Sequence, residues 1–99
     1  DYLWLDAFKS RIADNLIESL LKYATLLDEH EAFDTKLLIS DIIFRFDSVN
    51  EAALRLKCAT YVFMRKQYMA KTTYEHFCRE YKSLYDEPFE HSFNSIISQ

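Results

Sequence analysis

Glycine is absent from this 99-residue chain, and proline occurs once, at Pro88. Tight β-turns, hairpins and phosphate-cradling loops rely on these two residues, so their scarcity indicates few tight turns and few strands. The length is enough for one domain with a single modest core. We therefore expect residues 1–99 to form one all-α domain. Because the sequence starts without methionine on a strong apolar pattern, we expect that domain to be part of a longer protein.

Long apolar runs are missing as well. No segment approaches the roughly 20 apolar residues that a helix needs to span a bilayer. The opening "DYLWLDAFKS" lacks the cationic flank and the small-residue cleavage site of a signal peptide. We therefore expect a cytoplasmic protein that does not bind membranes.

Basic residues are outnumbered by acidic ones, and the formal net charge of −4 argues against a dominant phosphate-binding role. The second half is less acidic, with its basic residues between Arg55 and Lys82. Those residues fit the solvated faces of amphipathic helices; a docking face for an acidic partner and marginal DNA contact are the alternatives. No recognition element presents arginine and asparagine together, as direct base readout needs, so we expect no duplex DNA binding by this chain alone.

The two cysteines, Cys58 and Cys78, form neither a disulfide framework nor a CxxC motif. Together with His76 and His91 they lack any repeated metal-ligand spacing. On a helix His76 and Cys78 would point about 200° apart, so they cannot hold one ion. We expect buried, inert cysteines, with no metal site and no cofactor.

Candidate catalytic acids are confined to a polar turn that contains Asp28, Glu29 and Glu31. They have no histidine or serine partner in a plausible pocket, and a solvated turn explains them fully. We therefore expect no catalytic residues and no enzymatic activity.

Apolar residues recur at helical spacing in the first half of the chain. We expect one long helix over residues 4–28, ending in "DEHEAFD", and a second over residues 35–46 with Asp34 as its N-cap. The second segment is apolar on most of its surface, as expected for a helix between two neighbours, although a strand is the competing assignment. The expected buried stripe of the first helix consists of Leu5, Phe8, Ile12, Leu16, Leu20, Ala24 and Leu27.

Three further helices are expected in the second half. Ser48 and Glu51 match a capping box, which predicts a helix over residues 49–65. Another is expected over residues 68–85, and Pro88 near the first position predicts a last helix. That last helix would carry Phe89, Phe93, Ile96 and Ile97. The aromatic stripe of residues 68–85 indicates core packing rather than a base-stacking platform, and it consists of Tyr74, Phe77, Tyr81 and Leu84.

Residues 34 positions apart correspond along the chain, and a 34-residue helix-turn-helix period is that of the tetratricopeptide repeat. The second copy fits the repeat pattern well, whereas Lys36 and Ser40 replace alanine and an aromatic residue in the first. We therefore expect about five helices in a tetratricopeptide-like right-handed superhelical array. The corresponding pairs are Leu20 and Leu54, Ala24 and Cys58, Leu27 and Tyr61, Lys36 and Ala70, Ser40 and Tyr74, and Ile43 and Phe77.

Two segments carry a resemblance to a known family. "DYLWLDAFKSRIADNLIESLLKYATLL" resembles the opening of the bacterial transcriptional activator domain. "DSVNEAALRLKCATYVFMRKQYMAKTTYEHFCREYKSLYDEPFEHSFNSII" is similar to its second half, with a D-P-x-x-E-x-A junction, an A-x-x-x-Y-x-x-F helix and a closing E-P. The chain departs from that pattern at Ser48, which replaces proline, and at Arg65, which replaces a turn glycine. The link "YDEP" is also shorter than in the family.

The resemblance implies a regulatory module of a transcription factor, C-terminal to a winged-helix or similar DNA-binding domain. Antibiotic regulatory proteins and related response regulators have this organisation. The resemblance implies a non-catalytic domain that controls DNA binding or activation through its contacts. The partner would be another domain of the same regulator, or a second protomer in a possible homodimer. A generic tetratricopeptide-type adaptor domain of another signalling protein is the alternative.

The repeat register also predicts a binding face. The inner helices would present one concave surface, which repeats of this kind use for binding. From that surface we select Thr25, Asp28, Arg55, Val62 and Phe63 as candidate protein-binding residues, although Val62 and Phe63 would alternatively pack under the final or a missing helix. The full set is Glu18, Leu21, Thr25, Asp28, Arg55, Ala59, Val62 and Phe63.

Overall fold

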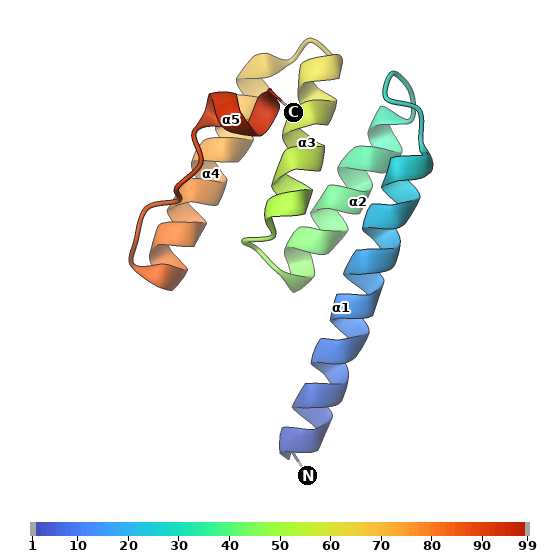
Figure 1. Ribbon diagram of the computed structural model, residues 1–99, viewed down its shortest axis with the longest axis vertical. Helices are drawn as coiled ribbons and strands as arrows, with labels where there is room; N and C mark the ends of the chain where they lie inside the picture. The colour runs from blue at the N-terminus through green and yellow to red at the C-terminus, as the bar shows by residue number, and fades with distance from the viewer. Residues whose placement is uncertain (1, 99) are drawn as a thin grey trace.

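The computed structural model describes residues 2–98, which form five α-helices and no strand, so the all-α prediction is confirmed (Figure 1). The helices are α1 (Tyr2–Leu26), α2 (Phe33–Phe46), α3 (Glu51–Phe63), α4 (Gln67–Tyr85) and α5 (Phe93–Ile97). The strand alternative for residues 35–46 is wrong, because α2 covers all of them.

Helices that follow one another in the chain also pack together. In Figure 1, α2 lies between α1 and α3, and α4 lies on the other side of α3. The short α5 packs against α3. The chain therefore forms two helical hairpins, α1–α2 and α3–α4, with α5 covering the end of the second.

Corresponding positions of the two hairpins have corresponding burial. Ala24 and Cys58 are both buried, as are Ile43 and Phe77, and each pair is 34 residues apart. This equivalence is consistent with a helical repeat, and the superhelical form of the array stays a prediction.

The core consists of two clusters that meet at α3. One joins the α3–α4 hairpin to α5 through Leu54, Cys58, Ala70, Phe77 and Ile96. The other joins α1, α2 and α3 through Ala24, Ile39, Ile43 and Ala53. Phe44 packs against both clusters. At the crossing of α3 and α4 the Cys58 thiol donates to the Ala70 carbonyl oxygen at 3.5 Å, so two small residues allow this close approach without glycine.

Turns that would ordinarily use glycine are made by other residues in left-handed conformations. The φ angles are 58° at Ala32, 62° at Arg65 and 56° at Asp86. Arg65 is the position at which the repeat pattern expects glycine. There the Lys66 amide donates to the Tyr61 carbonyl at 2.8 Å and the Arg65 amide to the Val62 carbonyl at 3.0 Å, which is the Schellman arrangement. The turn geometry is therefore kept although its usual residue is missing.

Two of the predicted N-caps are wrong. α2 begins at Phe33, one residue before Asp34, which therefore lies in the first turn; the N-cap is Ala32, without a side-chain bond. α3 begins at Glu51 rather than Val49, because the Asn50 side chain accepts a hydrogen bond from the Ala53 amide at 2.9 Å. Ser48 is displaced from the cap because Asp47, Ser48 and Val49 form the turn, in which the Asp47 carboxylate accepts from the Val49 amide.

The last helix is present, but the start predicted for it at Pro88 is wrong, because residues 86–92 are irregular. The last helix begins at Phe93, with the Ser92 hydroxyl accepting from the Ser95 amide at 3.2 Å. Phe89 accounts for the extended segment. Its ring packs against the rings of Phe77, at 4.9 Å, and Tyr81, at 5.2 Å, so tertiary packing holds this segment away from a helical conformation.

Much of the stripe expected to be buried on α1 is exposed. Of its seven members only Ala24 is buried, and Leu20 and Leu27 pack beside it. α1 has 25 residues and α2 has 14, so the first half of α1 projects past its partner (Figure 1). The radius of gyration is 14.5 Å, somewhat above the roughly 13 Å of a compact domain of this length.

The aromatic stripe on α4 is buried in part. Phe77 is 2% exposed, and Tyr74 and Tyr81 are half-buried in contact with the core. Leu84 is 59% exposed, so its assignment to the core is wrong. It lies near the end of α4, one residue before Tyr85, where α5 does not reach it.

Candidate protein-binding groove

A groove of about 540 Å³ runs between α1 and α3. Leu21 and Thr25 line it from α1, and Arg55, Ala59 and Phe63 line it from α3. All five belong to the concave face expected from the repeat register. The surface is mainly apolar, with a few charged side chains among its lining residues.

Arg55 is a charged residue of this groove with one buried guanidinium nitrogen that has no hydrogen-bond partner among the described residues. One guanidinium nitrogen, Nη2, lies 2.9 Å from the Glu51 carboxylate, and the His91 ring nitrogen Nε2 lies 3.5 Å from the same oxygen. The other nitrogen, Nη1, is buried and has no hydrogen-bond partner within residues 2–98. A buried donor without a partner costs about 1–3 kcal/mol, and more for a charged group. The rest of the Arg55 side chain, which is 28% exposed, is the part that a partner can reach.

Phe63 is the exposed aromatic residue of the groove. It ends α3 and is 43% exposed. The His30 ring, from the turn between α1 and α2, meets the Phe63 ring edge-on at 5.1 Å. The aromatic ring is therefore held from one side and open on another, which is the arrangement of an aromatic anchor at a protein interface.

Lys36 lies at the α2 side of the groove and was not identified as a site residue from the sequence. It is only 6% exposed, and its ammonium group donates to the Asp28 carbonyl oxygen. The repeat pairing of Lys36 with Ala70 could have identified it, because the repeat buries a small residue at this position. Its cationic end is thus committed to closing the α1–α2 turn.

Three residues of the predicted face lie elsewhere. Asp28 is in the turn, where its carboxylate accepts from the His30 amide at 2.8 Å. Val62 packs against the cluster between α3, α4 and α5, as the alternative assignment expected. Glu18 is exposed and pairs with Lys22 at 3.4 Å. The structure therefore brings together Thr25, Arg55 and Phe63 from the selected set, and separates Asp28 and Val62 from them.

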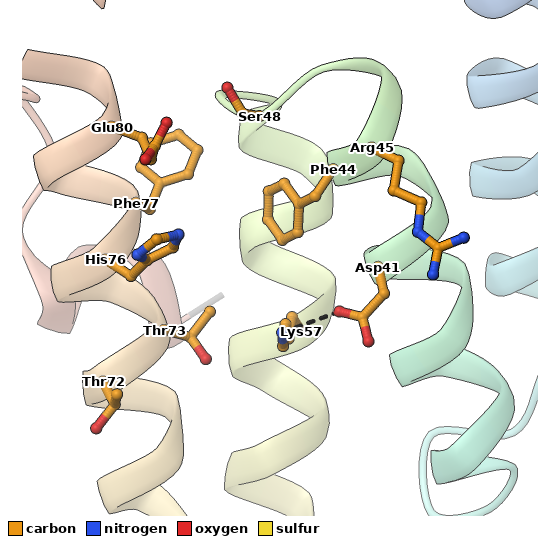
Figure 2. A pocket seen from close by; sticks show the side chains of 10 residues that line it. All are labelled: Asp41, Phe44, Arg45, Ser48, Lys57, Thr72, Thr73, His76, Phe77 and Glu80. Carbon is orange, nitrogen blue, oxygen red and sulfur yellow. Dashed lines mark hydrogen bonds and ion pairs between the residues drawn. The ribbon is translucent and has the colours of Figure 1, made fainter. Parts of the chain in front are cut away.

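A second hollow lies between α2, α3 and α4 and has a similar volume of about 540 Å³. Figure 2 shows the Phe44 and Phe77 side chains converging from α2 and α4, with ring centroids 6.4 Å apart. The Lys57 ammonium of α3 is paired with the Asp41 carboxylate at 2.9 Å. His76 and Glu80 approach from α4. Charges of both signs line this hollow, so it favours no single ligand charge.

Neither cysteine forms a disulfide. Burial raises the pKa of the Cys58 thiol to about 12, against a smaller opposing effect of the nearby Lys57 charge. The thiol is therefore neutral at ordinary pH and is a packing group rather than a nucleophile. Residues 2–98 contain no group of three or more histidine, cysteine or acidic side chains placed to hold a metal ion.

No protein-family model matches the chain, and no curated protein or solved structure matches it significantly. The described helices include none that is long and apolar enough to cross a bilayer.

Proposed function

We propose that this chain is a non-catalytic interaction domain of a bacterial transcriptional regulator. In this proposal the α1–α3 groove receives a segment of another domain of the same regulator, and the contact controls DNA binding or activation. Support comes from two sources: the resemblance of both sequence halves to the bacterial transcriptional activator domain, and the two helical hairpins related by 34 residues.

The observation that carries the proposal is the combination of Arg55 and Phe63 in one groove. Arg55 offers a guanidinium group on a side chain that is 28% exposed, and Phe63 offers an exposed aromatic surface. A segment with a carbonyl or carboxylate group beside an apolar side chain would complement both. Two hairpins form a shallow groove, which suits docking of a neighbouring domain better than enclosure of a long peptide.

The DNA contact itself is assigned to another domain. The chain is net anionic, and basic residues such as Lys66, Lys71, Arg79 and Lys82 are solvated on several faces of the second hairpin. Scattered charges neutralise few phosphates at once, so they provide little affinity for a duplex.

The experiment uses the full reading frame that encodes this chain, with reporter transcription as its measurement. Phe63→Ala and Arg55→Ala should change reporter output at least severalfold, because each removes one complementary group of the groove. Tyr68→Ala is the matched control, since Tyr68 is an exposed aromatic residue of α4 outside the groove. Unchanged output in both groove variants at normal protein levels would contradict the proposal.

A second candidate function is a tetratricopeptide-type adaptor in another signalling protein. The repeat equivalence and the groove favour it as much as they favour the regulator. The adjoining domain separates the two candidates. A winged-helix or receiver domain upstream supports the regulator, and an unrelated kinase or protease domain supports the adaptor.

A further inference from the structure

The Glu51 carboxylate connects the groove to the segment that follows α4. Its oxygen Oε1 lies 2.9 Å from Nη2 of Arg55, one turn further along α3, and 3.5 Å from Nε2 of His91. His91 belongs to the irregular residues 86–92, which run from the end of α4 back along that helix to α5 (Figure 1). One oxygen atom therefore contacts a groove residue on one side and the irregular segment on the other.

The Arg55 guanidinium is held by Glu51. Nη2 donates to the Glu51 carboxylate, and Nη1 has no hydrogen-bond partner among residues 2–98. The Arg55 side chain also lines the groove and is 28% exposed. A charge that appears on the other side of Glu51 therefore acts on the groove through this one carboxylate.

His91 is kept beside Glu51 by contacts that do not depend on its charge. The Tyr74 hydroxyl of α4 donates to the His91 backbone carbonyl oxygen. The Phe89 ring packs edge-on against the imidazole, with ring centroids 5.5 Å apart, and is itself anchored against Phe77. The imidazole therefore stays near Glu51 whether or not it is protonated.

His91 is the group of this cluster that changes charge near neutral pH. Histidine ordinarily titrates between about pH 5 and 8, whereas carboxylates and arginine keep their charges in that range. Burial raises the pKa of Tyr74 to about 12, and burial with the nearby Glu87 charge raises the pKa of Tyr81, so both tyrosines stay neutral. The described residues of α5 carry no titratable side chain. The titratable and charged groups around His91 are Glu51 and Arg55 of α3, Tyr74 and Tyr81 of α4, and Glu87 and Glu90 of its own segment.

Protonation of His91 changes the charge balance beside Arg55. While the imidazole is neutral, Glu51 offsets the Arg55 charge, and the Glu90 carboxylate, 3.6 Å from His91 Nε2, adds negative charge nearby. The imidazolium places a positive charge in contact with both carboxylates. The Glu51 charge is then shared between two cations, so less of the Arg55 charge is neutralised. An anionic group that reaches Arg55 in the groove meets a more positive potential in this state.

We propose that His91 regulates the groove by its protonation, which draws on the Glu51 carboxylate, raises the positive potential at Arg55 and so favours docking of a segment that presents a carboxylate. This inference rests on the proposed function, because the groove is its target. Glu51 is a positioning residue that holds Arg55 and transmits the charge of His91. Neither Glu51 nor His91 lines the groove itself.

The first test follows the Arg55 side chain of this chain by NMR between about pH 5 and 8, where histidine titrates. The expected result is a shift of the Arg55 Nε–Hε signal that follows the titration of the His91 ring signals. His91→Gln should abolish this pH dependence, and Glu51→Gln should weaken it. His76→Gln, on the exposed surface of α4, should keep it. An Arg55 signal that does not follow His91, or a response that persists in His91→Gln, overturns the proposal.

The second test fixes the charge at residue 91 in the reporter assay of the full reading frame. His91→Arg is positive and His91→Gln is neutral at every pH. Their reporter outputs should differ by about twofold or more, the effect of a partly exposed ion pair, and Phe63→Ala should remove the difference. If Phe63→Ala changes the output but the two variants of His91 give equal output, this inference fails and the proposed function stands. If Phe63→Ala and Arg55→Ala have no effect, the proposed function fails, and the regulation of the groove fails with it.

Discussion

Arg65 illustrates how this chain builds turns without glycine. Its φ of 62° places a side chain where the left-handed conformation crowds Cβ against the following carbonyl oxygen. The two Schellman hydrogen bonds hold the residue there, and they end α3 at the position the two hairpins require. The conformational cost is local and is offset by the packing of α3 against α4.

Arg65→Gly should therefore stabilise the domain by about 0.5–1 kcal/mol, since glycine adopts this conformation without the steric penalty. Arg79→Gly is the matched control. It lies on the exposed surface within α4, where glycine should instead cost about 1 kcal/mol. Urea denaturation of both variants measures the difference, and destabilisation by Arg65→Gly would contradict the role assigned to the left-handed turn.

Cys58 should make stability depend on pH only in alkaline solution. Its pKa rises from 9.0 to about 12 in the folded chain, because burial disfavours the thiolate. Below about pH 9 the thiol is protonated in both states and has no effect. Between about pH 9 and 12 only the unfolded chain releases the proton, so folding loses stability as the pH rises.

Cys58→Ala removes the titrating thiol and keeps the other side chains that lose a proton in alkaline solution. The difference in unfolding free energy between the two proteins should be constant below pH 9 and should shift in favour of the alanine variant above it. Cys58→Leu should be destabilising at every pH by about 1–3 kcal/mol, because a larger side chain does not fit beside the Ala70 carbonyl. Rapid reaction of native Cys58 with a thiol reagent at neutral pH would contradict its burial.

At the scale of helices, position along the element decides which members of an apolar stripe are buried. On α4, Phe77 faces both Phe44 of α2 and Phe89 of the segment before α5, whereas Leu84 lies close to the helix end. Both residues belong to the same helical stripe in the sequence. They differ in what covers them.

Phe77→Ala should cost about 3–5 kcal/mol, because it opens a cavity between three elements. Leu84→Ala should change stability by less than about 0.5 kcal/mol, since that side chain is already mostly in water. Thermal melts followed by circular dichroism compare the two variants directly. Equal losses would show that the end of α4 is covered after all.

The lengths and neighbours of the helices also explain which of their features could be predicted from the sequence. Helical spacing predicted the number and order of the helices, because it reports the amphipathic period of each segment. It did not predict that Leu5, Phe8 and Ile12 are exposed, because periodicity does not say whether a neighbour is long enough to cover a stripe. Local cap patterns also misplaced three helix starts. α2 begins at Phe33, before the expected cap Asp34. Asn50 and Ser92 are the caps of α3 and α5, in place of Ser48 and the start expected from Pro88.

The candidate groove was predicted to a similar extent. The repeat register placed Thr25, Arg55 and Phe63 on one face, because residues at equivalent repeat positions point the same way. It misplaced Val62, which is adjacent to Phe63 and therefore turns about 100° toward the α4 cluster. The unpartnered Arg55 nitrogen depends on three-dimensional surroundings that the sequence pattern does not contain.

At the scale of the whole molecule, the net charge and the distribution of basic residues predict that the chain alone does not bind duplex DNA. The isolated chain should not retard duplex DNA in a gel-shift titration at low or moderate salt, because it is net anionic and its basic residues are dispersed. Micromolar binding with a steep salt dependence would contradict this expectation. Binding that appears only after an upstream domain is restored would agree with it.

The position of α3 between the two core clusters has a consequence for how the molecule opens. Ala53 and Leu54 are neighbours in the chain, both have no exposed surface, and they belong to different clusters. Amide hydrogens in the middle of α3 can therefore exchange with solvent only when both clusters separate, which requires global unfolding. Those in the first turns of α1 need only local fraying. Hydrogen exchange should thus divide the protein into a slow centre and a fast edge, with α3 reporting the full free energy of unfolding.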